Sequence, residues 1–176
     1  MRAAEFLIRT LKLAQGTMDV ALDGLTAKDL AYRPDGRVNT IGFLLWHMSR
    51  EEDYVISEFE ARSQVWVSQG WHKKFGRPAD SEETGYGFTP EEVGEFQFPP
   101  LRTLKGYQSA VRKETLRYLR RRTDEDFDAA MARSVAGQPT LGGQLGILTS
   151  EILQHTGQIA YLKGILAGFG WRKGWQ

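Results

Sequence analysis

The sequence contains no cysteine among its 176 residues. This absence excludes disulfide bonds, thiolate metal ligands and a cysteine nucleophile. Any thiol chemistry carried out by this chain would therefore need a thiol that is supplied by another molecule.

A marked excess of either charge is also missing. Lys and Arg number 23 and Asp and Glu number 22, so there is no general attraction to nucleic acid or to an acidic membrane. No apolar run is long enough to span a bilayer, and the early residue Glu5 does not fit a secretory signal peptide. We therefore expect a cytoplasmic protein with no nucleic-acid or membrane partner.

Helical periodicity is present in four parts of the chain. In each part, apolar residues recur at alternating steps of three and four. The length suits one domain that spans residues 1–176, without internal repeats. The sequence therefore predicts an all-α four-helix bundle. Its helices lie at about Ala3 to Leu22, after the capping pair Asn39-Thr40 from Ile41 through Phe59, at about Leu101 to Arg122, and at about Thr140 to Ala167.

The connection between the second and third helices, roughly residues 64–100, is long and rich in Gly and Pro. Such a crossover allows the third helix to run parallel to the second. Aromatic residues interleave with its glycines and favour a packed flap over a disordered tether. They either fill the core or line a substrate pocket: Trp66, Trp71, Phe75, Tyr86 and Phe88.

His155 occupies a core position of the fourth helix where the heptad pattern calls for Leu or Ile. Glu151 lies one turn earlier on the same face, where burial of an unpartnered carboxylate would be costly. His47 lies on the flank of the apolar stripe of the second helix. If these two helices are neighbours, His47, Glu151 and His155 converge within the bundle.

Two imidazoles and one carboxylate form a suitable site for zinc, nickel or ferrous iron, with coordination positions left open. A metal ion with open positions is a Lewis acid that lowers the pKa of bound water or thiol. The alternative is a His–Glu hydrogen bond without a metal. His72 is an alternative third ligand in place of Glu151, although a surface histidine beside Lys73 and Lys74 is the favoured interpretation.

Other residues near this predicted site have two interpretations each. Glu51 lies one turn after His47 and either orients the imidazole or pairs with a cation in solvent. Tyr54 either points into the same cavity or packs in the bundle.

Trp171 and Trp175 near the chain end either fold back on the bundle or join a partner subunit, and the second possibility predicts a homodimer.

Four motifs in order resemble the DinB-like superfamily over essentially the whole chain. They are residues 39–48 (NTIGFLLWHM), 70–76 (GWHKKFG), 154–161 (QHTGQIAY) and 166–170 (LAGFG). The resemblance implies a bundle with one metal ligand in helix two and two ligands four residues apart in helix four. Many members have His-x-x-x-His there, whereas this chain has Glu151, similar to the His, Glu, His set of the mycothiol-dependent maleylpyruvate isomerases, which are zinc proteins.

Members of this superfamily with known activity are largely thiol-dependent isomerases and S-transferases that use mycothiol or bacillithiol. The resemblance therefore implies a divalent-metal-dependent enzyme, with zinc or nickel, that acts on an electrophilic small molecule through a metal-bound thiol. A hydrolase that uses metal-bound water is one alternative. A non-catalytic metal-binding or interaction bundle is another, and an open coordination position facing a cavity distinguishes the enzymes from it.

Overall fold

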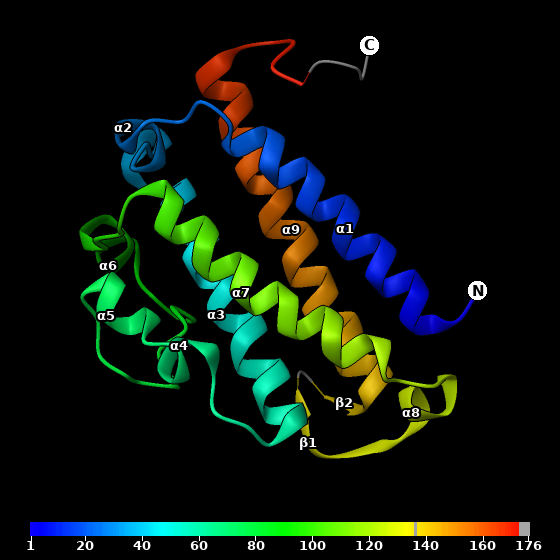
Figure 1. Cartoon of the computed structure of the whole chain (residues 1–176). Helices are drawn as coiled ribbons and strands as arrows, with labels where there is room; N and C mark the ends of the chain where they lie inside the picture. Colours follow the sequence, from blue (N-terminus) through cyan, green and yellow to red (C-terminus); the bar gives the residue numbers. More distant parts are fainter. Residues whose placement is uncertain (136, 173–176) are drawn as a thin grey trace.

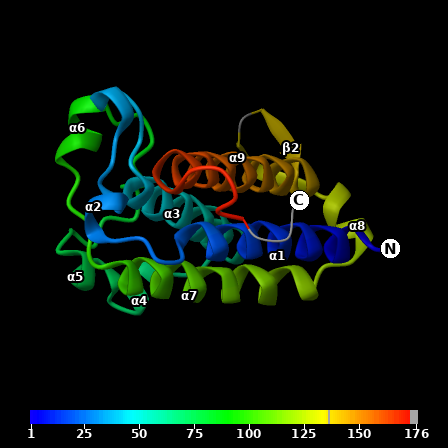
Figure 2. The same ribbon diagram turned by 90° about the horizontal axis from the view of Figure 1, so that it is seen from above.

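The computed structural model describes residues 1–135 and 137–172, and four long helices dominate it (Figures 1 and 2). Helix α3 packs against α7 and α9, and α1 packs against the same two helices. Figure 1 shows α3 and α7 running in one direction and α1 and α9 in the other. The predicted four-helix bundle and its parallel second and third helices are confirmed. The long helices are α1 (Ala3–Leu22), α3 (Ile41–Glu60), α7 (Leu101–Arg120) and α9 (Leu141–Ala167).

Threonine side chains cap the starts of several helices. The Thr40 hydroxyl accepts a hydrogen bond from the Phe43 amide at 3.0 Å, and the Thr140 hydroxyl accepts one from the Gly143 amide at 3.2 Å. Each such cap contributes about 1 kcal/mol and fixes where the helix begins. Capping boxes start the short helices α2 (Ala27–Leu30), α6 (Pro90–Glu95) and α8 (Asp124–Asp128).

The crossover between α3 and α7 is a folded unit. It contains α4 (Val65–Ser68), α5 (Trp71–Phe75) and α6, and it lies along α3 and α7 in Figure 1. Trp66 is fully buried, with its ring 5.1 Å from that of Phe75 and 5.3 Å from that of Tyr107 in α7. The predicted packed flap is correct. Earlier in the chain, a single 3-10 turn (Pro34–Gly36) precedes α3.

A small antiparallel hairpin precedes α9 and was not expected from the sequence. Strand β1 (Ala130–Val135) pairs with β2 (Gln138–Thr140), with Ala130 opposite Thr140. Gly137 has a positive φ of 74° at the turn between the strands. The hairpin contacts α9 and leaves the fold class helical.

Helix α3 is the most enclosed element, because α7, α9 and the crossover surround it. Every residue from Ile41 to Arg50 is buried. Further along, Glu52 is fully buried and pairs with Arg112 through two contacts of 2.7 and 2.9 Å. Arg112 also donates to the Leu11 carbonyl at 3.0 Å, so this one side chain connects α1, α3 and α7.

The outer sides of the long helices carry charge. Lys12 of α1 and Arg102 and Lys113 of α7 are exposed. In the described part of the chain, no helix combines the length and apolar character that a membrane span requires.

Trp171, just after α9, folds back on the bundle. It is partly buried and packs against the core, with its indole nitrogen 3.3 Å from where a side-chain carbon on Gly164 would lie. Gly164 therefore provides the room for this contact. Trp175, the other tryptophan expected either to fold back or to join a partner subunit, lies outside the described residues.

The buried pair predicts a large effect on stability. Arg112→Met should lower the free energy of unfolding by about 3–5 kcal/mol, because it leaves the Glu52 carboxylate buried without its partner. Lys105→Met is the control, since Lys105 and Asp19 form an exposed pair at 3.3 Å whose loss should cost less than about 1 kcal/mol. Denaturant unfolding of both variants measures the difference, and equal losses would contradict the role of the buried pair.

Candidate metal centre

The backbone of the crossover orients the His47 ring. His47 is buried in α3, and its Nδ1 atom lies 2.7 Å from the carbonyl oxygen of Thr84. A carbonyl can only accept, so Nδ1 carries the hydrogen and Nε2 keeps its lone pair. Nε2 is therefore the atom of His47 that is available to a metal ion.

His155 of α9 is held in a similar way by a side chain. Its Nδ1 atom lies 3.0 Å from Oε1 of Gln158, one turn later on the same helix. Its Nε2 atom lies 3.2 Å from Oε2 of Glu151, yet within the described residues this buried nitrogen has no partner with hydrogen-bond geometry. A lone pair facing a carboxylate is unfavourable unless a proton or a cation lies between them, so this pair of atoms fits a metal ion.

The three candidate ligands meet across the contact of α3 with α9. One ligand atom from each of His47, Glu151 and His155 lies within 4.8 Å of the other two. The two imidazole rings are 5.1 Å apart and nearly perpendicular. His72 is not part of this group, because it lies on α5 with its Nδ1 atom 3.1 Å from the Trp66 carbonyl.

Glu151 is less buried than the heptad argument required. Its side chain is 45% exposed, whereas that of His155 is 13% exposed. The inference that an unpartnered Glu151 carboxylate would be penalised by burial is therefore wrong. Glu151 lies at the edge of the apolar stripe of α9, where one side of the helix is open to solvent.

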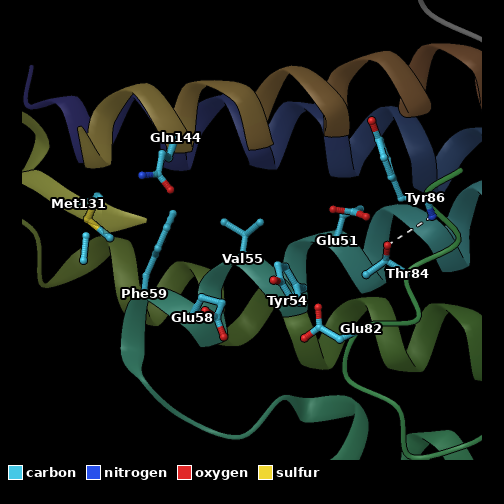
Figure 3. A pocket seen from close by; sticks show the side chains of 11 residues that line it. Glu51, Tyr54, Val55, Glu58, Phe59, Glu82, Thr84, Tyr86, Met131 and Gln144 are labelled. Atoms are coloured by element: carbon cyan, nitrogen blue, oxygen red, sulfur yellow. Dashed lines mark hydrogen bonds between the residues drawn. The ribbon is translucent and has the colours of Figure 1, made fainter. Parts of the chain in front are cut away.

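A cavity of about 600 Å³ lies beside α3, between it, the crossover, the hairpin and the start of α9, and His47, Glu151 and His155 are not among the described residues that line it (Figure 3). Thr84 connects the cavity with this group, because its carbonyl contacts His47 while the residue also lines the cavity. Glu51 and Tyr54 line the cavity as well. The expected role of Glu51 in orienting the His47 imidazole is filled instead by the Thr84 carbonyl. The wall is mixed in character, and its other members are Val55, Glu58, Phe59, Glu82, Tyr86, Met131, Ala132 and Gln144.

Sequence reasoning did not identify the two residues that orient the histidines. Gln158 could have been found, because it lies three residues after His155 on the same helix and such pairs are neighbours. Thr84 gave no signal, since a backbone carbonyl 37 residues away in sequence has no side-chain signature.

The surroundings of His47 favour its neutral form. Burial lowers the pKa of its imidazole below the ordinary 6.5, although the Thr84 hydrogen bond and the Glu51 charge oppose this shift. Neutral imidazole is the form that binds metal ions. Protons therefore compete with a metal ion for this ring only in acid.

This shift predicts a pH dependence of the metal-free protein. We expect His47 to titrate below 6.5, because burial disfavours the imidazolium in the folded state. The unfolded chain then binds the proton more readily, so the free energy of unfolding should fall as the pH decreases through 6.5 and level off below the folded pKa. NMR titration of the ring and unfolding at several pH values test this. In His47→Asn the slope should shrink, and an unchanged slope would assign it to other groups.

Comparison with known proteins identifies the family. Among solved structures, the chain resembles that of a conserved protein from Enterococcus faecalis, with a TM-score of 0.84 and 24% identity over 96% of this chain and 99% of that one. This likeness shows the fold alone. No curated protein matches the chain. A family model described as the DinB superfamily matches residues 10–159, and the chain therefore belongs to the DinB superfamily.

Proposed function

We propose that this protein is an enzyme that depends on one divalent ion, zinc or nickel, held by His47, Glu151 and His155. The observation that carries the proposal is the buried Nε2 atom of His155, which faces the Glu151 carboxylate without a hydrogen bond. The second imidazole reaches the same point, and two nitrogens with one carboxylate suit either metal.

The same group suits catalysis better than a purely structural role. Structural zinc sites have four protein ligands, whereas within the described residues this group offers three. When bound, the ion would supply Lewis acidity that lowers the pKa of a thiol or a water molecule at an open position. Thr84 and Gln158 would keep both rings in the tautomer that the ion needs.

The cavity would hold the substrate beside this group. Val55, Phe59 and Met131 give it an apolar wall that can bind the carbon skeleton of a small molecule and exclude water. Glu51 lies one turn from His47 and also lines the cavity. We assign its carboxylate the role of accepting the proton that the attacking thiol loses.

We further propose that the nucleophile is a low-molecular-weight thiol and that the reaction is S-transfer to, or isomerisation of, an electrophilic small molecule. The chain has no cysteine of its own, so the thiol must bind as a cosubstrate. The resemblance to mycothiol- and bacillithiol-dependent enzymes supports this choice.

Metal binding tests the ligand set directly. His155→Ala should weaken zinc and nickel binding by more than the roughly 10–100-fold that loss of a residue supporting a ligand costs, because it removes a ligand itself. Glu151→Ala should also weaken binding, while the control His72→Ala should leave it unchanged. Isothermal titration measures all three. The ligand assignment would be wrong if His72→Ala abolished binding and Glu151→Ala did not.

A conjugation assay tests the reaction. Zinc-loaded protein should accelerate the coupling of mycothiol, bacillithiol or glutathione to a small aromatic electrophile, and a chelator should remove the acceleration. Glu51→Gln should lower kcat while zinc still binds, because the proton acceptor is lost and the ligands remain. Turnover of an ester without added thiol would favour the hydrolase instead.

A further inference from the structure

Residues 80–84 of the crossover, here named the strap, lie against α3. Arg50 donates from Nε to the Glu83 carbonyl at 3.0 Å, and from Nη2 to the carbonyls of Asp80 and Ser81, both at 3.1 Å. One guanidinium thus contacts three carbonyls of the strap. The next carbonyl, that of Thr84, accepts from His47.

The Arg50 side chain has no unused hydrogen-bonding capacity. Its Nη1 atom donates to Oε1 of Gln64 at 2.7 Å and to the Tyr107 hydroxyl at 3.2 Å. With the three strap carbonyls, these contacts occupy all five donors of the guanidinium. The side chain is fully buried, so displacement of the strap would leave buried charged donors without acceptors, which is strongly unfavourable.

Arg50 and His47 bind neighbouring peptide groups of the strap. They lie one turn apart on α3, and they contact the adjacent carbonyls of Glu83 and Thr84. Two side chains on one face of a rigid helix therefore define the position of two successive peptide groups. The place of the Thr84 carbonyl follows from how Arg50 binds the residues before it.

Gly85 fixes the other end of the strap. Its φ is +86°, and a Cβ atom there would lie 2.7 Å from the Trp46 ring and 3.0 Å from the Phe43 ring. Only glycine lets the backbone approach α3 this closely. The Phe43 ring in turn stacks on the His47 imidazole, 5.7 Å away at an angle of 4°.

We propose that Arg50 and Gly85 are positioning residues for the candidate metal centre. They hold the Thr84 carbonyl where it keeps the hydrogen of His47 on Nδ1 and leaves Nε2 for the ion. The second half of this inference rests on the proposed metal binding, whereas the first half concerns the metal-free protein. The two can therefore be tested separately.

The sharpest variant is Gly85→Ala, with Gly87→Ala as its matched control. Gly87 has a similar φ of +80°, yet a Cβ atom there would meet nothing within 4 Å. Both substitutions place alanine at a similar positive φ, and only at Gly85 would the new Cβ atom collide with α3. In ¹H–¹⁵N correlation spectra of the neutral, metal-free protein, His47 should show a protonated Nδ1 in wild type and Gly87→Ala and a mixture of tautomers in Gly85→Ala.

The same two variants also test the effect on metal binding. Gly85→Ala should weaken zinc binding about 10–100-fold, as loss of a group that orients a ligand does, and should alter the visible spectrum of the cobalt-substituted protein. Gly87→Ala should change neither. If Gly85→Ala kept the tautomer, or if Gly87→Ala lost it equally, the positioning role would be overturned.

Arg50→Lys tests the second positioning residue, with Arg112→Lys as its control. Lysine keeps the charge and loses the fork that reaches three carbonyls, so His47 should lose its single tautomer. Arg112 is also buried, but it binds Glu52 and the Leu11 carbonyl, and its replacement should lower stability while the tautomer remains. Should Arg50→Lys not fold, the Gly85 pair decides alone. Failure of wild type to bind zinc would refute the proposed function and leave the tautomer result valid.

Discussion

A buried guanidinium must place five N–H groups against acceptors, and this requirement shapes the middle of the molecule. Arg50 is fully buried in α3, and three of its acceptors are strap carbonyls. Asp53, 3.7 Å away, compensates the charge and also accepts from the Tyr107 hydroxyl. Burial, together with the Asp53 charge, raises the pKa of Tyr107 well above its ordinary value, so that hydroxyl stays a donor. The crossover cannot leave α3 without exposing this network.

The enclosure of α3 makes the candidate metal centre asymmetric. His47 comes from the enclosed helix and is held by a backbone carbonyl, whereas Glu151 comes from the rim of α9 and is half exposed. The His47 side of the group is therefore buried, and the Glu151 side is open to solvent. Burial lowers the pKa of His47, which keeps a neutral nitrogen ready at neutral pH. The carboxylate supplies negative charge from the solvent-exposed side, where it loses little of its solvation.

The parts of the structure that could be predicted are those with local patterns. Periodicity identified the four long helices, and spacing of four residues placed Glu151 beside His155. The exposure of Glu151 could not be predicted, because it depends on how α9 is rotated against α3. The role of Arg50 was equally hidden, since its strap acceptors are backbone carbonyls 30–33 residues away. The hairpin before α9 is too short to show an alternating pattern.

The backbone and the side chains of the strap make different contacts. Its carbonyls hold Arg50 and His47, while the side chains of Glu82 and Thr84, and of Tyr86 just beyond, line the cavity. A carbonyl is present whatever the residue, so these side chains can change without loss of the contacts that orient His47. His155 differs, because its partner is the Gln158 side chain and depends on that residue. The lining of the cavity can thus vary along the strap at little cost to the contacts that orient His47, provided that Gly85 and Arg50 remain.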